Sequence, residues 1–89
     1  ATPLWLEKAF DAPNVPILTA DILKCGNNLF VVGFASGMVH LYVAASGKKV
    51  IELSAHSRQV NALCCHPSKS IFATVGDDTF LNVWEVQSG

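Results

Sequence analysis

The chain has 89 residues, which is enough for one small domain. Its formal net charge is −1, with six Lys and Arg residues in all, so no basic patch is available for a phosphate backbone and nucleic-acid binding is not expected. No apolar run approaches the roughly 20 residues that cross a bilayer, and no export signal is visible, so we expect a cytoplasmic protein with no membrane segment.

Short apolar runs separated by turn residues follow one another along the whole chain. The runs are rich in Val, Ile, Leu, Phe and Thr, and Gly, Asn, Asp, Ser and Pro stand between them. This pattern is typical of strands joined by tight turns, and no window shows the 3.6-residue period of a helix. The sequence therefore predicts an all-β fold, with strands at 4–10, 16–23, 29–34, 38–44, 49–53, 59–65, 71–76 and 79–86.

Two parts of the chain resemble each other. The segment VGFASGMVHLYVAASG (32–47) aligns with VGDDTFLNVWEVQSG (75–89) if one residue is skipped in the second. Val32 and Gly33 then fall on Val75 and Gly76 at an offset of 43, and Tyr42 falls on Trp84 at an offset of 42. A period of about 40–45 residues with four strands per repeat indicates propeller blades.

The composition suggests that more protein covers part of this surface. Hydrophobic residues make up 51% of the chain and charged residues only 15%, against about 25% charged residues in ordinary soluble domains. Several expected strands are also apolar on both faces, which fits blades packed between other blades. A small β-barrel that binds an apolar ligand is the alternative fold, and it would show strict alternation along each strand.

The cysteines and histidines give no sign of a metal or cofactor. Three cysteines, Cys25, Cys64 and Cys65, are an odd number for a disulfide scaffold, so we expect buried, reduced thiols. Cys64 and His66 could share a strand face, but two ligands do not make a zinc site. We therefore expect no cofactor.

The second repeat resembles the WD-repeat β-propeller family. Ala55-His56 stands where the family has Gly-His, and Trp84-Glu85 stands where it has Trp-Asp. Between them, FATVGDD and TFLNVW also fit the family pattern. The first repeat is degenerate, with Tyr42 in place of the Trp, Ser36 in place of the turn Asp and Val32 in place of the strand hydroxyl residue. The resemblance implies four-stranded antiparallel blades, whose strands are named a to d from the inside outward.

The family also implies a buried hydrogen-bond network of four side chains. Residue by residue, these are His56, Thr74, Asp78 and Trp84. The Trp indole donates to the Thr hydroxyl, the hydroxyl to one His nitrogen, and the other His nitrogen to the Asp carboxylate, so each polar group has a partner. A Thr-His-Asp chain also has the order of a hydrolase triad, but the Trp would occupy the hydroxyl oxygen. We therefore expect a structural network and no catalysis.

The family's partner-binding face is formed by the loops that join strands d to a and b to c. In the second repeat this face presents Arg58, Gln59, Asn61 and Asp77. The resemblance implies a non-enzymatic scaffold that binds a protein or peptide there.

The strand order implies that the two blades are incomplete alone. We expect 1–15 to hold an outer strand of a neighbouring blade and a linker, 16–54 to form the degenerate blade, and 55–89 to form a blade without its outer strand, in the order d-abcd-abc. Because two blades cannot close a ring, either remaining blades of a longer propeller or other copies of this chain must complete it. In the second case, the expected inter-chain strand contains Leu4, Trp5, Leu6 and Phe10.

Overall fold

The structure is a computed structural model that describes residues 9, 13–24 and 26–87. In this part of the chain all regular structure is β, which confirms the expected class, and no helix is long and apolar enough to cross a membrane. The expected strand at 4–10, with Leu4, Trp5, Leu6 and Phe10, lies outside the described residues. The seven described strands are β1 (Ile17–Leu23), β2 (Leu29–Phe34), β3 (Met38–Val43), β4 (Lys49–Ser54), β5 (Val60–Cys65), β6 (Ile71–Gly76) and β7 (Leu81–Glu85).

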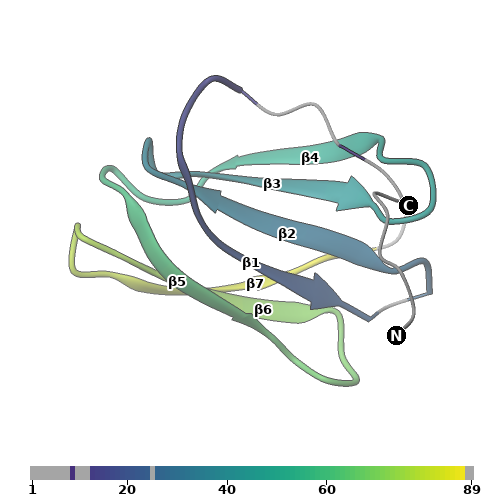
Figure 1. The fold of residues 1–89 in the computed structure, drawn as a ribbon. Coiled ribbons are helices and arrows are strands. Elements are labelled where there is room, and N and C mark those ends of the chain that lie inside the picture. Colours follow the sequence, from purple (N-terminus) through teal and green to yellow (C-terminus); the bar gives the residue numbers. More distant parts are fainter. Residues whose placement is uncertain (1–8, 10–12, 25, 88–89) are drawn as a thin grey trace, which may run out of the picture.

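The strands form two antiparallel sheets that lie face to face (Figure 1). The first sheet has the order β1-β2-β3-β4 and the second the order β5-β6-β7, so every strand pairs with its neighbour in sequence. Two separate sheets among the described strands make the closed-barrel alternative wrong. Each sheet follows the up-and-down path expected of a propeller blade.

The register of the two sheets corrects the repeat alignment. Phe30 pairs with Tyr42 and Phe72 pairs with Trp84, so the second and third strands of each sheet are related by an offset of 42. In the first strands, Thr19 opposite Gly33 corresponds to Ala62 opposite Val75, and the offset is 43. The one-residue difference therefore lies in the first turn of each sheet, and the alignment of Val32 on Val75 was wrong: Val32 corresponds to Thr74.

The hydrophobic core lies between the two sheets. The inner strands β1 and β5 pack alongside each other, and the Asp21 carboxylate of β1 accepts a hydrogen bond of 2.8 Å from the Cys65 backbone N–H of β5. The buried residues of this core are Leu23, Leu29, Val31, Val39, Leu41, Ala55, Val60 and Phe72.

Two glycines of the first sheet bring the second sheet close. A Cβ on Gly33 would lie 2.8 Å from the Val60 side chain, and a Cβ on Gly37 would lie 2.1 Å from the His56 carbonyl oxygen. Gly37 also has a φ of 93°, which L side chains rarely adopt. Its carbonyl accepts a hydrogen bond of 3.0 Å from the His56 N–H, so the β2–β3 turn holds the loop before β5 in place.

The outward face of the second sheet is apolar and exposed. Leu81 and Val83 are 66% and 65% exposed. Cys64 is exposed on the same face with a free thiol, and Cys65 is half-buried. The expectation that all the thiols are buried was therefore wrong for Cys64. Cys64 pairs with Ala73 on the face turned away from the first sheet, where the described residues provide no neighbouring strand layer.

Candidate functional site

The second sheet brings together all four side chains of the expected network. Thr74 of β6 pairs with Asn82 and Trp84 of β7 pairs with Phe72, so Thr74 and Trp84 are two residues out of register. Their side chains therefore lie on the same face, the one turned toward the first sheet. Trp84 Nε1 donates to Thr74 Oγ1 at 3.0 Å, and the same oxygen lies 2.8 Å from His56 Nε2. His56 Nδ1 lies 2.8 Å from Asp78 Oδ1. We call His56, Thr74, Asp78 and Trp84 the polar network.

Donor and acceptor chemistry fixes the direction of each bond. The indole of Trp84 can only donate, and the ionised carboxylate of Asp78 can only accept. Nδ1 of His56 therefore donates to Asp78, and Nε2 accepts from the Thr74 hydroxyl. No buried side-chain nitrogen or oxygen in the described part of the chain is without a partner. A fully paired network of this kind rigidifies its surroundings, since breaking any bond leaves a buried group unsatisfied.

Asp78 also organises the turn between β6 and β7. Its carboxylate accepts hydrogen bonds from the backbone N–H of Ser57 at 3.1 Å and of Phe80 at 3.2 Å. Desolvation raises the pKa of Asp78, but the hydrogen bonds from His56, Ser57 and Phe80 outweigh it, so the pKa lies below its ordinary value. One carboxylate thus joins the β6–β7 turn to the loop before β5.

Asn82 is a further member of this site that the sequence reasoning missed. Its side-chain amide donates to the Ala55 carbonyl at 3.0 Å, and it pairs directly with Thr74. Asn82 stands two residues before Trp84, so strand alternation places both on one face. That spacing is the signal that could have identified it.

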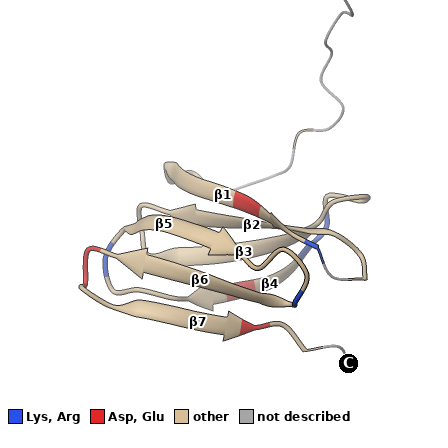
Figure 2. Cartoon of the chain, turned by 90° about the horizontal axis from the view of Figure 1, so that it is seen from below, with Lys and Arg blue, Asp and Glu red and all other residues tan. Residues whose placement is uncertain are grey.

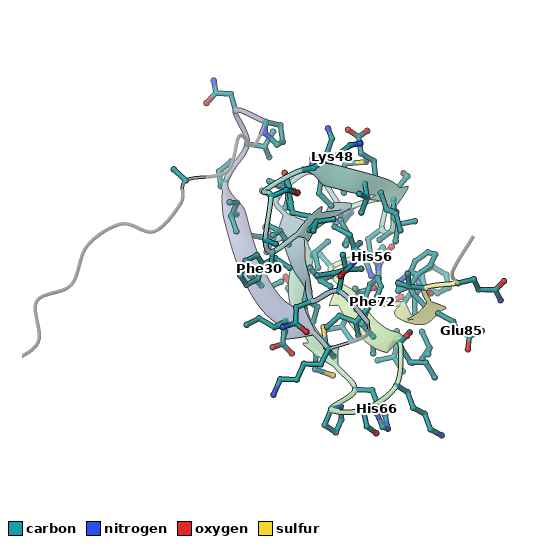
Figure 3. The ribbon with its side chains drawn as sticks, turned by 90° about the vertical axis from the view of Figure 1, so that its right-hand side faces the viewer. Phe30, Lys48, His56, His66, Phe72 and Glu85 are labelled. Carbon is teal, nitrogen blue, oxygen red and sulfur yellow. The ribbon has the colours of Figure 1, made fainter. Side chains whose placement is uncertain are left out.

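The geometry of the polar network does not suit nucleophilic catalysis. The side chain of Thr74 is 0% exposed, and its oxygen already accepts the Trp84 proton. Figure 3 shows His56 and Phe72 between the two sheets, whereas Lys48, His66 and Glu85 lie at the periphery. A nucleophilic hydroxyl needs an open cleft beside oxyanion donors, whereas the Thr74 side chain is fully enclosed.

The first sheet replaces the polar network with aromatic packing. Tyr42 and His40 occupy the positions of Trp84 and Asn82, and both are buried. His40 Nδ1 lies 3.2 Å from the Tyr42 hydroxyl, and the His40 ring packs against Phe34 with 4.6 Å between centroids. Burial lowers the pKa of His40, although Glu52 opposes the shift. At these positions the first sheet therefore has a packed pair of rings in place of the hydrogen-bonded chain of the second sheet.

The expected partner face holds a row of hydrogen bonds. Gln59 Nε2 donates to Asn61 Oδ1 at 2.9 Å, and Asn61 Nδ2 donates to Asp77 Oδ1 at 2.6 Å. The Asp77 backbone N–H donates to the Gln59 carbonyl at 3.1 Å, which ties the two loops together. Arg58 is exposed in the same loop but makes none of these bonds. We call Arg58, Gln59, Asn61 and Asp77 the loop surface.

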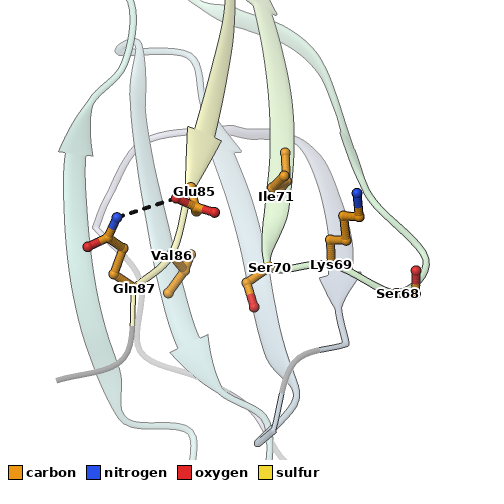
Figure 4. A pocket seen from close by; sticks show the side chains of 7 residues that line it. All are labelled: Ser68, Lys69, Ser70, Ile71, Glu85, Val86 and Gln87. Carbon is orange, nitrogen blue, oxygen red and sulfur yellow. Dashed lines mark hydrogen bonds between the residues drawn. The ribbon is translucent and has the colours of Figure 1, made fainter.

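A shallow groove lies at the opposite end of the second sheet (Figure 4). It runs between the β5–β6 turn and the end of β7, and the Glu85 carboxylate accepts a hydrogen bond from the Gln87 side chain at its edge. His66 is half-buried at this end, and its Nδ1 accepts hydrogen bonds from the Ser68 and Lys69 backbone N–H groups. The residues that line the groove are Ser68, Lys69, Ser70, Ile71, Glu85, Val86 and Gln87.

No group of three or more His, Cys, Asp or Glu side chains within the described ranges could hold a metal ion.

Comparison with known sequences agrees with these features. A model of the WDR54 family matches residues 12–89. Human WD repeat-containing protein 54 is 31% identical over 58 residues, which covers 65% of this chain and 17% of the human protein. Rat WD repeat domain 54 is 33% identical over 58 residues, with the same coverage. The chain thus spans about a sixth of the length of these relatives.

Solved structures share the fold. A chain of Chaetomium thermophilum Polycomb Repressive Complex 2 bound to GSK126 superposes with a TM-score of 0.78 at 25% identity, covering 86% of this chain and 18% of that one. A chain of the computationally designed Ika4 protein superposes with a TM-score of 0.72 at 19% identity, covering 89% of this chain and 46% of that one. With a family match along 12–89, and with His56 and Trp84 placed as a WD repeat requires, this chain belongs to the WDR54 family of WD-repeat propeller proteins.

Proposed function

We propose that this chain is a non-enzymatic propeller segment that acts as a protein-interaction scaffold, and that a protein or peptide binds its loop surface. The row of hydrogen bonds from Gln59 through Asn61 to Asp77 carries the proposal. These side chains are exposed, yet their hydrogen bonds hold them in one arrangement. A partner that binds preordered groups loses less conformational entropy, which favours affinity.

The polar network supports the loop surface from beneath. Asp77 binds the Gln59 carbonyl through its own N–H, and the adjacent Asp78 binds His56 and the Ser57 N–H. Both loops are therefore fixed by groups on the inner side, while Asp77 offers a carboxylate on the outer side. Chains of Polycomb Repressive Complex 2, a protein assembly, share this fold, which supports a role in protein contacts.

The chemistry of the loop surface favours a partner with hydrogen-bond donors. The Asp77 carboxylate and the Gln59 carbonyl oxygen are acceptors, and Arg58 adds a cation at one side. An extended peptide with a cationic or amide side chain opposite Asp77 fits this arrangement. The buried hydroxyl of Thr74 supports the non-enzymatic part of the proposal, because a substrate would have no access to it.

A peptide array tests this proposal. The chain is applied to a library of extended peptides, and the Asp77→Ala variant is compared with the unmodified chain. We expect peptides with a Lys or Arg to lose binding in the variant. Glu85→Ala is the matched control, because it removes the same charge from an exposed position at the far end of the sheet. The proposal would be contradicted if the unmodified chain, Asp77→Ala and Glu85→Ala bound the peptides equally well, or if none of the three bound any peptide.

We also propose that the propeller closes with blades from other copies of the chain, with the remaining blades of a longer propeller as the alternative. β7 is the edge of a three-stranded sheet, whereas β4 completes the first sheet. Residues 4–10 have the apolar pattern of an outer strand and are the proposed inter-chain strand. The free thiol of Cys64 supports a reducing, cytoplasmic location. Sedimentation equilibrium of the 89-residue chain tests this idea, and a monodisperse monomer would contradict it.

A further inference from the structure

We infer that Phe80 is an apolar anchor for the partner of the loop surface, and that this partner is a peptide with a bulky apolar side chain two residues from a basic one. This role rests on the proposed binding of a peptide at the loop surface. It adds a specificity-determining residue that the loop surface does not include, and it adds a sequence pattern for the partner.

Phe80 is a large apolar side chain that the fold leaves in contact with water. It is 63% exposed and comes directly after the β6–β7 turn. Val75 pairs with Leu81, whose side chain lies on the outward face of the sheet. At the next pair along, the Phe80 carbonyl accepts a hydrogen bond of 3.4 Å from the Gly76 N–H. Because side chains alternate along a strand, Phe80 lies on the opposite face from Leu81.

The polar network accounts for the exposure of Phe80. Its cross-strand neighbour Gly76 has no side chain, and a Cβ there would lie 2.7 Å from His56 Cγ and 3.0 Å from Asp78 Oδ1. The space over Gly76 is thus already filled by an imidazole and a carboxylate. The Phe80 ring cannot pack across this pair and stays at the loop end of the sheet.

Hydrogen bonds hold the backbone of Phe80 in one position. Its N–H donates to Asp78 Oδ1 at 3.2 Å. The turn before it is a three-residue hairpin loop, in which Thr79 has a φ of 73° and donates its N–H to the Gly76 carbonyl at 3.2 Å. An aromatic side chain with two rotatable angles on a fixed backbone loses little conformational entropy when a partner covers it.

The same turn supplies the charge that selects a basic partner. Asp77 is exposed, and Asn61 donates to its Oδ1. Its other carboxylate oxygen has no hydrogen-bond partner in the described part of the chain, so it is open to a donor. Figure 2 shows the acidic β6–β7 turn at one end of the sheet, whereas β5 and β6 carry no charged residue.

One short peptide can reach both anchors. Asp77 and Phe80 are three residues apart, so their Cα atoms are at most about 11 Å apart, and the turn between them shortens that distance. In an extended peptide, alternate side chains lie on one side, about 7 Å apart. A peptide with a basic residue opposite Asp77 can therefore place an apolar residue on Phe80 two positions away.

A double-mutant cycle tests this pairing. The peptides that bind on the array are made as free peptides, each with a second form in which the apolar residue two positions from the Lys or Arg is replaced by alanine. Fluorescence anisotropy measures their affinities for the unmodified 89-residue chain, Phe80→Ala and Leu81→Ala. Leu81→Ala is the matched control, because Leu81 is 66% exposed, against 63% for Phe80, but lies on the opposite face.

We expect Phe80→Ala to weaken binding of the original peptides about tenfold, as the loss of an aromatic anchor does, and Leu81→Ala to leave it unchanged. The alanine form of each peptide should also bind the unmodified chain about tenfold more weakly. It should lose no further affinity for Phe80→Ala, because the two changes remove the same contact. Phe80→Tyr should retain binding, since it keeps the ring, and a melting curve shows that each variant is folded.

Equal effects of Phe80→Ala and Leu81→Ala would overturn the inference, as would additive losses in the cycle or binders without an apolar residue at this spacing. If Asp77→Ala abolishes binding while Phe80→Ala does not weaken it, the loop-surface proposal stands and the role of Phe80 falls. If no peptide binds the unmodified chain, both fail.

Discussion

At the scale of single residues, Thr74 is the central member of the polar network. One hydroxyl group accepts from Trp84 and donates to His56, so it satisfies two buried ring nitrogens at once. Its methyl group packs in the apolar core around it, where the side chain is fully buried. No other residue of similar size offers both a donor and an acceptor together with that methyl group.

Thr74→Val should therefore destabilise the protein by about 1–3 kcal/mol, since it keeps the shape but leaves the Trp84 donor and the His56 acceptor unpaired. Urea denaturation measures the change. Thr74→Ser should retain most of the free energy of unfolding that Thr74→Val loses, because serine keeps the hydroxyl group. Thr19→Val is the control, as Thr19 lies outside the polar network, and an equal loss in both valine variants would count against the assigned role.

Asp78 makes the stability of the folded protein depend on pH. Its pKa in the folded protein lies below the ordinary value of 3.8, so its contribution is fully present above that value and is lost as the pH falls through the lower folded pKa. Asp78→Asn should melt at a lower temperature than the unmodified protein at neutral pH. The difference in melting temperature between the two proteins should become smaller in strong acid, where Asp78 of the unmodified protein is protonated. Thermal melts across this pH range check the expectation, and a difference in melting temperature that does not change with pH would contradict it.

The sequence identified the four members of the polar network because each is a distinctive residue at a fixed place in the repeat. It missed Asn82, because residue types do not reveal a backbone partner such as the Ala55 carbonyl; the spacing from Trp84 indicates only which face Asn82 lies on. It also placed Cys64 inside, since an apolar strand looks the same whether a neighbour covers one face or two. The exposed face depends on what the second sheet packs against, which residue types do not encode.

At the scale of elements, the contact between the β2–β3 turn and the loop before β5 couples the two sheets. Gly37 accepts the His56 N–H, and His56 in turn binds the β6–β7 turn through Asp78. Three loops are thus joined in series, and the position of the loop surface depends on a glycine in the other sheet.

Gly37→Ala should cost about 2 kcal/mol or more, because the new Cβ has both an unfavourable φ and a backbone oxygen in its way. Gly26→Ala is a matched control. Gly26 also has a positive φ, of 45°, but has no atom within 4 Å of the added Cβ, so about 1 kcal/mol is expected. Thermal melting of both variants separates the effect of the steric clash at Gly37 from that of backbone strain. Similar losses of stability in the two variants would show that the clash is unimportant.

The element boundaries were predictable where turn residues flank an apolar run. β2 and β6 match the expected 29–34 and 71–76. The last strand was expected at 79–86 but spans Leu81–Glu85, because Thr79 adopts a positive φ of 73° in the turn. The position of the one-residue difference between repeats could not be read from the sequence, because it depends on which residues pair across the strands.

At the scale of the whole molecule, the outward face of the second sheet remains apolar and exposed. The polar loops lie at the sheet ends, and the exposed Leu81 and Val83 lie on a broad face. Apolar area of this kind favours association, because its burial releases about 25 cal/mol per Å².

Val83→Lys should reduce association of the chain without lowering its melting temperature, since the side chain is exposed in the described sheets. Sedimentation velocity at several concentrations measures association. Val39→Lys is the contrasting variant, because Val39 is fully buried between the sheets and a charge there should unfold the protein. An unchanged sedimentation profile for Val83→Lys would contradict the expectation.

The two close-approach glycines also bear on how such repeats diverge after duplication. Gly33 and Gly37 belong to the first sheet and admit the second, whereas Val75 and Thr79 occupy those places in the second sheet. The two repeats are therefore not interchangeable modules. A recombination event that reversed their order would bring a branched side chain to a junction where only a hydrogen atom fits, so the contact between the two sheets depends on the order of the repeats.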